Sequence, residues 1–272
     1  VGSEMCIRDR AILNVIPVQS RDFTWDVTAS FSLLRSEVVS IADGIDQIYV
    51  GGYVGRGNIA IPGLPYGILE GELIRRDYGS LDGTDHTQVH WDDRTGYTPI
   101  VNANGGYQFL GYGVIGNPQP DFVYGVTNTL SYKWATLRVQ FDSQVGGDVF
   151  STTNSTLLGR GILQETDFDR FVPVVTNGLS ADGTPNTTQT TANAHYWPNT
   201  GVFYDENSIY DASVMRLREV SLSFVAPKSF LNGTPFGNAS LTLSAQNIWH
   251  YAWNTPSGTN FDPEVISYGA GS

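Results

Sequence analysis

The segment from residue 121 to residue 150 alternates apolar and polar side chains with a period of two. The alternation fills two consecutive runs of roughly eleven residues, one on each side of Lys133 and Trp134. Successive side chains of a β-strand point to opposite faces, so each run is predicted to be a strand with one apolar face. The short link predicts an antiparallel hairpin. Soluble strands average about 5–6 residues, whereas a tilted strand needs about 9–11 to cross a bilayer. This hairpin is therefore long enough to span a membrane.

Aromatic side chains lie near the ends of both predicted strands, as in the interfacial girdles of outer-membrane barrels. They are Phe122, Tyr124, Tyr132 and Trp134. One residue departs from the pattern, because Asn128 is a polar residue on the apolar face.

Three further segments show the same alternation. Segment 22–34 is the cleanest, with an apolar side chain at every odd position from 23 to 33. Segment 213–225 changes phase, which predicts a β-bulge near residues 218–219. Segment 239–251 alternates throughout, except that Asn247 is polar on the apolar side. A short apolar stretch, 11–16, is predicted to be the end of one more strand, followed by a turn at 17–21. Six strands or partial strands are therefore predicted.

The connections between these strands alternate in length. Short links are predicted at 17–21, 133–134 and 226–237, whereas the connections 36–120 and 147–210 have 85 and 64 residues. Short turns at one end and long loops at the other are typical of outer-membrane barrels, whereas a β-sandwich shows turn signals every 8–12 residues or so. The predicted fold class is all-β, a partial antiparallel up-and-down transmembrane β-barrel with long extracellular loops. In this chain it would be a curved open sheet with two unpaired outer strands.

Two faces of the sheet follow from the alternation. The side chains predicted to face lipid are Phe23, Trp25, Phe31, Leu137, Val139, Phe141, Leu241 and Leu243. Those predicted to face the lumen are Asp26, Arg138, Gln140, Thr242 and Gln246. Inside the long connections, a strand is expected at 67–76, a short helix within 156–170 and a polar tip at 180–194.

Composition excludes some classes of function. The formal net charge of −12 argues against nucleic acid as a partner, since nucleic-acid binding needs clustered Lys and Arg. No run of about 18 apolar residues is present, so no transmembrane helix is expected.

Residues 1–10, VGSEMCIRDR, match one reading frame of a sequencing adaptor and are expected to be an artefact rather than native sequence. An ordinary N-terminal tail is the alternative. With the artefact set aside, the only cysteine, Cys6, says nothing about the redox compartment.

Five segments together resemble the C-terminal barrel of the SusC/RagA family of TonB-dependent outer-membrane transporters. Their order and spacing follow the family, and they span nearly all of residues 11–272. They are FTWDVTASFSLLRSEVVSIADG (23–44), GLPYGILEGELIRRDYG (63–79), GNPQPDFVYGVTNTLSYKWATLRVQFDSQVGGDVFS (116–151), YDASVMRLREVSLSFVAPKSFLNGTPFGNASLTLSAQNIWHYA (210–252) and FDPEV (261–265).

The resemblance implies a barrel of about 22 strands with a plugged lumen in the outer membrane of a Gram-negative bacterium. It implies import of glycans, oligosaccharides or peptides, without enzymatic activity or a cofactor. The implied partners are a SusD-like surface lipoprotein, outer-membrane lipid and, through an N-terminal part outside this chain, the TonB complex. Residues 11–272 would be a C-terminal barrel part truncated at both ends, lacking the plug and the closing strand. The rival interpretations are a secreted β-sandwich carbohydrate-binding module and a carbohydrate-active enzyme.

Two groups of polar residues were weighed as chemical sites. Asp82, Asp85, His86, His90, Asp92 and Asp93 have side chains that bind Ca²⁺ or Zn²⁺, but a solvated polar loop is the preferred interpretation, and no metal is predicted. The carboxylate pairs Asp205–Glu206 and Asp167–Asp169 suggest general acid–base chemistry, but surface acidity is preferred for both.

Aromatic residues in the long loops are the candidates for contacts with substrate or with the lipoprotein, because Tyr and Trp anchor interfaces. The predicted contacts are Trp91, Tyr107 and Trp197, and packing within the loops is the alternative for each. The wider set comprises Tyr49, Tyr53, Trp91, Tyr97, Tyr107, Tyr112, Tyr196, Trp197 and Tyr204.

Overall fold

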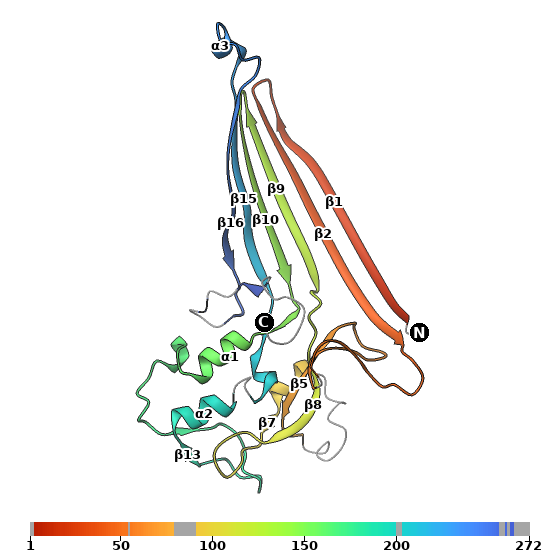
Figure 1. Cartoon of the computed structure of the whole chain (residues 1–272), viewed down its shortest axis with the longest axis vertical. Helices are drawn as coiled ribbons and strands as arrows, with labels where there is room; N and C mark the ends of the chain where they lie inside the picture. Colours follow the sequence, from red (N-terminus) through yellow and green to blue (C-terminus); the bar gives the residue numbers. More distant parts are fainter. Residues whose placement is uncertain are drawn as a thin grey trace.

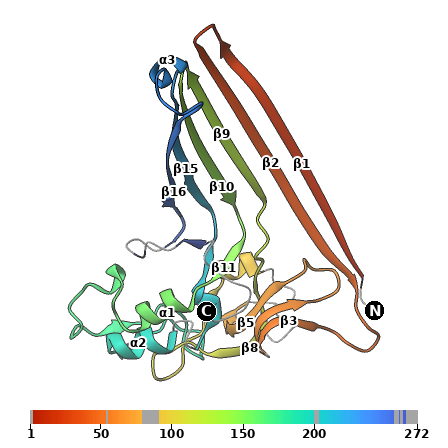
Figure 2. The same cartoon turned by 45° about the horizontal axis from the view of Figure 1, so that its top comes forward.

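A computed structural model describes residues 3–53, 55–78, 91–199, 203–255, 259 and 262–263. A long antiparallel sheet carries its short turns at one end and a separate folded body at the other (Figures 1 and 2). We call this second part the loop body; it comprises the described residues of 41–121 and 146–213. None of the helices in the described part of the chain is long and apolar enough to cross a membrane.

The long sheet has six strands in the order β1-β2-β9-β10-β15-β16, and each pair of neighbours is antiparallel. The open sheet and its up-and-down order are therefore as predicted, with β1 and β16 at the edges. The β-sandwich interpretation is wrong for the described residues, since no second sheet packs on either face (Figures 1 and 2). The strands are β1 (Ser3–Gln19), β2 (Phe23–Ser40), β9 (Phe122–Tyr132), β10 (Ala135–Val145), β15 (Val214–Val225) and β16 (Ser240–Tyr251).

The central hairpin has the predicted bounds. Strands β9 and β10 pair without a break from Phe122 and Val145 to Tyr132 and Ala135. Lys133 closes the turn with a left-handed φ of 51°, and its backbone N–H donates to the Asp22 carbonyl at 2.9 Å. The turn between β1 and β2 thus holds the turn between β9 and β10 in place.

The prediction for the start of the chain is wrong in one respect. The sequence suggested a strand at 11–16 and a turn at 17–21, but β1 continues to Gln19. Pro17 lies at a register shift between Val15 and Val18, on an edge strand, where a missing backbone N–H is tolerated. Residues 3–10 are part of β1, but strand pairing uses backbone groups that every sequence has. Their origin as an adaptor sequence stays a prediction.

The predicted bulge in β15 is confirmed. Gln140 pairs with Glu219 while Phe141 pairs with Leu217, so Arg218 is the additional residue. The bulge explains why apolar residues change from odd to even positions along this strand.

Residues that pair across the sheet share a face, so the registers define rows that run across all its strands. The apolar rows have large exposed side chains, since Phe31 is 42% exposed and Leu241 and Leu243 are both 58% exposed. One row is Val18, Trp25, Leu130, Leu137, Leu222 and Leu243; a polar row on the other face is Thr28, Thr127, Gln140, Glu219 and Gln246.

Aromatic residues bracket the apolar face. Near the turn end, one row contains Phe23, Tyr132 and Phe224; near the loop body, another contains Phe31 and Tyr124. The two rows are eight residues apart along β2, which is about 26 Å at about 3.3 Å per residue. Outer-membrane barrels have an apolar band about 25 Å tall between aromatic girdles. At a strand tilt of about 35–45° this length gives an apolar band about 19–22 Å tall, close to that height.

Asn128, the polar exception on the apolar face, has a partner there. The indole Nε1 of Trp25 on the neighbouring strand donates a hydrogen bond to Asn128 Oδ1 at 3.2 Å. This hydrogen bond gives the indole N–H an acceptor and the Asn128 side-chain carbonyl a donor.

This pair predicts a coupling between two substitutions. Trp25→Phe leaves the Asn128 amide without its donor, and Asn128→Leu leaves the indole without its acceptor. The double variant should therefore lose less stability than the sum of the losses of the two single variants. We expect a coupling energy of about 1 kcal/mol in a double-mutant cycle on the complete barrel. Urea unfolding in lipid vesicles measures it, and a coupling energy of zero would contradict the assignment.

The loop body has its own fold. Its largest sheet is four-stranded, in the order β3-β4-β5-β8, and the strand predicted at 67–76 is confirmed as β5. The helix expected within 156–170 is partly confirmed, because α1 occupies 152–159 and only a short 3₁₀ turn, η4, follows. The polar tip at 180–194 runs into the helix α2.

The elements of the loop body are β3 (Ile48–Tyr53), β4 (Arg56–Ala60), β5 (Ile68–Ile74), β6 (Arg76–Asp77), η3 (Trp91–Gly96), β7 (Thr98–Pro99), β8 (Phe109–Gly116), β11 (Asp148–Phe150), α1 (Thr152–Gly159), η4 (Gln164–Thr166), β12 (Val174–Val175), β13 (Gln189–Thr190), α2 (Ala192–Asn199), η5 (Asp205–Ser208) and β14 (Ile209–Asp211). The turn between β15 and β16 contains one more helix, α3 (Lys228–Leu231).

Most of the fully buried side chains lie in the loop body. Ile59, Ile68, Leu73, Ile74 and Val101 are each at most 2% exposed. The long sheet has mostly half-buried and exposed side chains, so the loop body holds the chain's hydrophobic core.

Candidate functional site

The loop body is organised around the short 3₁₀ helix η5, whose first residue, Asp205, is completely buried. Arg56 of β4 pairs with this carboxylate: its Nε donates to Oδ2 at 2.9 Å, and its Nη2 lies 2.7 Å from Oδ1. The backbone N–H of Glu72 donates to Oδ2 at 3.0 Å. These contacts tie η5 to the four-stranded sheet.

Gly71 makes this approach possible. A Cβ at this position would lie 2.6 Å from Asp205 Cβ and 2.5 Å from the Ile115 side chain. Only glycine leaves room for the carboxylate here.

Burial changes the protonation preferences of this cluster. Burial raises the pKa of Asp205, although Arg56 and the Glu72 amide oppose the shift. Burial also raises the pKa of Glu72, and the negative charge of Asp205 raises it further. The Arg56 guanidinium is therefore shared by two carboxylates, since Glu72 Oε2 lies 3.9 Å from its Nη2.

The next residue, Glu206, is anchored separately. Arg76 Nη2 lies 2.7 Å from Glu206 Oε1, and Arg76 Nε donates to the Arg94 carbonyl at 3.0 Å. Arg94 donates in turn to the Val114 carbonyl at 2.5 Å. Burial raises the pKa of Glu206, opposed by the two arginines.

The preferred interpretation of Asp205 and Glu206 as surface acidity is therefore wrong. Both carboxylates are buried, and each pairs with a different arginine, Asp205 with Arg56 and Glu206 with Arg76. They therefore anchor η5 within the loop body. Asp167 and Asp169 are exposed, as surface acidity predicts.

Trp91 lies beside the Glu206 anchor. It helps to line a polar pocket of about 230 Å³ whose other walls come from β6, η3, β8, β11, η5 and β14. The lining residues are Arg76, Trp91, Arg94, Ile115, Asp148, Glu206, Asn207 and Ile209.

Tyr107 and Trp197 have different surroundings. Tyr107 packs edge-on against Tyr204 with ring centroids 6.3 Å apart, and the Tyr204 hydroxyl donates to the Tyr107 carbonyl at 2.6 Å. Burial raises the pKa of Tyr107. Trp197 lies on α2 with the Arg160 guanidinium 5.2 Å from its ring centroid. The pocket beside Trp91 includes neither residue among its lining, so these contacts do not unite the three predicted residues in one site.

Other aromatic residues of the loop body are more exposed, and some of them were not among the candidates predicted from the sequence. Tyr112 is 54% exposed and was in the wider predicted set, whereas Phe109, Phe171 and Phe203 are 51%, 96% and 49% exposed and were not. Their signal in the sequence is an aromatic side chain within a polar or Gly-rich stretch. Exposed rings in the loop body are stronger candidates for contacts than Tyr107, which is held by packing.

The proposed cation cluster lies mostly outside the described residues. Residues 82–90 are not described, nor is the side chain of Asp92, while Asp93 is exposed. Within the parts of the chain that the structure describes, no three His, Cys, Asp or Glu side chains form a metal-binding group.

A second ion network, not predicted from the sequence, lies on the polar face of the long sheet. Arg216 is 4% exposed, and its Nη2 lies 2.6 Å from Asp262 Oδ1. Asp142 on β10 is 3.7 Å from Arg216 Nη1 and also pairs with Arg218, the bulge residue. Arg218 Nη1 donates to Asn247 Oδ1 at 3.3 Å. The bulge residue Arg218 thus adds a third charged side chain of the sheet to this network, and Asp262, in the FDPEV segment, pairs with Arg216.

Comparison with known proteins finds similar sequences and similar folds. No family model matches the chain. The TonB-dependent receptor P3 of Formosa agariphila is 26% identical over 270 aligned residues, which cover 91% of this chain and 24% of the relative. The TonB-dependent receptor P26 of the same organism is 25% identical over 263 residues, covering 92% and 25%. The chain thus spans about a quarter of the length of these relatives.

Solved structures with the same fold include the RagAB peptide transporter, with a TM-score of 0.58, 18% identity and coverage of 99% of this chain and 28% of that one. The RagAB peptide importer in its closed-closed state has a TM-score of 0.62, 16% identity and coverage of 99% and 28%. Its open-open state has a TM-score of 0.60, 18% identity and coverage of 99% and 27%. The chain is therefore similar in sequence to part of two TonB-dependent receptors and has the fold of part of the RagAB transporter, as its resemblance to the SusC/RagA family predicted.

Proposed function

We propose that the complete protein imports nutrients across the outer membrane of a Gram-negative bacterium, with energy from the TonB complex. The observation that carries the proposal is the open up-and-down sheet with an uncovered apolar face, short turns at one end and a folded loop body at the other. An apolar face bracketed by aromatic rows suits lipid, and the polar face with its ion network suits a water-filled lumen.

The substrate in this proposal is a glycan, an oligosaccharide or a peptide, captured with a SusD-like surface lipoprotein. The structural neighbours are described as a peptide transporter and a peptide importer, which favours testing peptides first. The exposed aromatic side chains of the loop body supply contact area that suits either a peptide or a sugar ring.

The predicted contacts are tested by replacing Trp91 and Trp197 with Ala, one at a time, in the complete transporter. Each replacement should lower uptake or lipoprotein co-purification about five- to tenfold, since an interface anchor contributes more than about 1 kcal/mol. Tyr107→Ala should instead expose loop-body amides to hydrogen exchange, because the Tyr107 ring packs on Tyr204. Uptake is measured with labelled peptide and oligosaccharide mixtures in parallel.

A matched control is Phe236→Ala, which removes an aromatic ring that is 67% exposed at the turn end, far from the loop body. It should leave uptake and lipoprotein pairing unchanged. If Trp91→Ala and Trp197→Ala import and pair like the parent while the barrel assembles normally, these residues are structural and the prediction of contacts is wrong.

A further inference from the structure

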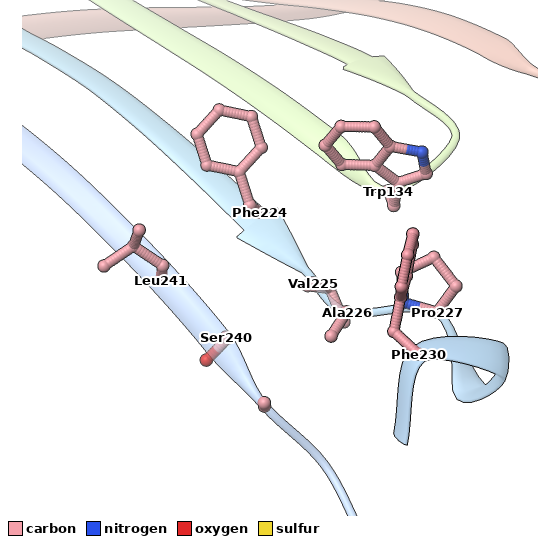
Figure 3. Close-up of a pocket in the computed structure, with 9 residues that line it drawn as sticks. Trp134, Phe224, Val225, Ala226, Pro227, Phe230, Ser240 and Leu241 are labelled. Carbon is pink, nitrogen blue, oxygen red and sulfur yellow. The ribbon is translucent and has the colours of Figure 1, made fainter. Parts of the chain in front are cut away.

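The turn end of the long sheet has an apolar pocket of about 350 Å³ (Figure 3). Trp134 comes from the β9–β10 turn, and its ring centroid is 5.6 Å from that of Phe224 on β15. Figure 3 shows Phe230 of α3 and Pro227 beside Trp134, with Leu241 on the next strand. The lining residues are Trp134, Phe224, Val225, Ala226, Pro227, Phe230, Ala239, Ser240 and Leu241.

The pocket is continuous with the apolar face of the sheet. Phe224 pairs with Leu241 and with Ala135, and this row leads through Tyr132 to Phe23. Phe230 is 75% exposed, so one wall stands free on the side of the sheet that faces lipid in the proposed orientation. An occupant would therefore enter from the membrane.

The two lysines of the whole chain are each next in sequence to a residue that lines this pocket. Lys133 precedes Trp134, Lys228 follows Pro227, and both are exposed. The chain has a net charge of −12, yet the segments 131–136 and 225–241 contain no acidic residue. The Lys133 ammonium lies 5.3 Å from the Tyr132 ring centroid, which holds the charge at the edge of the apolar face. The neighbouring turn adds Arg21 and Asp22, whose carbonyl accepts from the Lys133 N–H, so the turn end keeps a net positive charge in an acidic protein.

We propose that this pocket binds an anionic phospholipid of the periplasmic leaflet. Its acyl chain lies against Trp134, Phe224 and Leu241, and its phosphate is held by Lys133 and Lys228. Long basic side chains place their stems on apolar surface and their charges at the membrane interface, where anionic lipids attract them. Charge complementarity and the opening toward the bilayer favour a lipid over a periplasmic protein. The proposal rests on the membrane orientation of the sheet and goes beyond nutrient import.

The test compares phosphatidylglycerol with phosphatidylcholine of the same acyl chains, added to the complete transporter in detergent and counted by native mass spectrometry. The parent should bind phosphatidylglycerol more tightly. The double variant Lys133→Gln/Lys228→Gln should lose about 30-fold in affinity for phosphatidylglycerol, about fivefold per lysine, which corresponds to about 1 kcal/mol for each basic residue near an anionic surface. Its affinity for phosphatidylcholine should not change.

Two further variants make the test specific. Phe230→Ala removes a wall of the pocket and should lower the affinities for both lipids alike. Arg35→Gln removes a positive charge on β2 near the loop body and should change neither. Heat-modifiable gel mobility confirms that each barrel is folded.

Unchanged phosphatidylglycerol binding by the double variant, or unchanged binding of both lipids by Phe230→Ala, would overturn the proposal. Failure of the parent to bind either lipid would also overturn the proposal and would leave a periplasmic protein as the occupant of the pocket. A folded barrel that binds the lipid but takes up no nutrient would count against the proposed function alone.

Discussion

Val139→Arg in the complete barrel is expected to lower the free energy of unfolding by about 2–4 kcal/mol, the cost of a lipid-facing arginine near the bilayer midplane. Val139 lies on the apolar face, in the row that contains Asn128 on β9 and Val27 on β2. Val27 is midway between the aromatic residues Phe23 and Phe31, so this row lies at the centre of the apolar band. An arginine there cannot reach either interface without distorting the bilayer.

Arginine on the opposite face should be tolerated far better. Gln140→Arg is the depth-matched control, since Gln140 is the next residue of the same strand and pairs with Glu219 on the polar face. Thr242→Arg, also on the polar face, is a second control nearer the turn end. Unfolding titrations from lipid vesicles give the three free energies. Equal losses for Val139→Arg and Gln140→Arg would show that the faces are assigned wrongly.

Asp205→Ala is expected to open the loop body, with a loss of about 3 kcal/mol in local stability. Removing one partner of a buried ion pair costs about 3–5 kcal/mol, and the lower value applies because the Arg56 side chain is 33% exposed. The substitution also removes the acceptor of the Glu72 backbone N–H. Asp205→Asn keeps an acceptor oxygen and should cost less than the alanine variant.

Hydrogen exchange of the β5 and η5 amides measures this loss, because the long sheet does not depend on the cluster. Asp167→Ala is the matched control, since Asp167 is an exposed carboxylate of the same loop body. If the β5 and η5 amides exchange at the same rate in Asp205→Ala and Asp167→Ala, η5 is not anchored by its buried carboxylate.

The same cluster gives the loop body a pH dependence of known sign. Burial raises the folded-state pKa values of Asp205 and Glu72 above their ordinary values of 3.8 and 4.5. The stabilisation from the retained protons is complete below the ordinary values and is lost as the pH rises through the folded-state pKa values. Protection of the β5 amides should therefore decrease with rising pH in this window, and the decrease should be smaller in Asp205→Asn.

The long sheet was predictable because alternation along a strand is a local property. The bounds of the central hairpin, the bulge near Arg218 and the two faces all follow from which neighbouring residues are apolar. Pro17 was misjudged because proline normally signals a turn, whereas an edge strand with a register shift accommodates it. Whether a strand lies at an edge is decided by the order of strands in the sheet.

The candidate site was less predictable, because its contacts join residues that are distant in the chain. Arg56 and Asp205 are 149 residues apart, and Arg216 and Asp262 are 46 apart. Nothing in the local sequence DENS distinguishes a buried anchor from an exposed acidic turn. The same holds for the loop aromatics, since exposure depends on what folds over each ring.

The sequence alone determined that the chain forms long membrane-type strands with one apolar face, short turns and large loops, since period-two patterning and spacing contain that information. Only the tertiary structure decided how the exceptions are satisfied. It brings Trp25 to the amide of Asn128, it buries Asp205 against Arg56, and it brings Trp134 and Phe230 from two different turns into one apolar pocket. The physical reason is that a polar or charged group is stable in a dry place only with a partner, and strand register and loop packing choose that partner across long sequence separations.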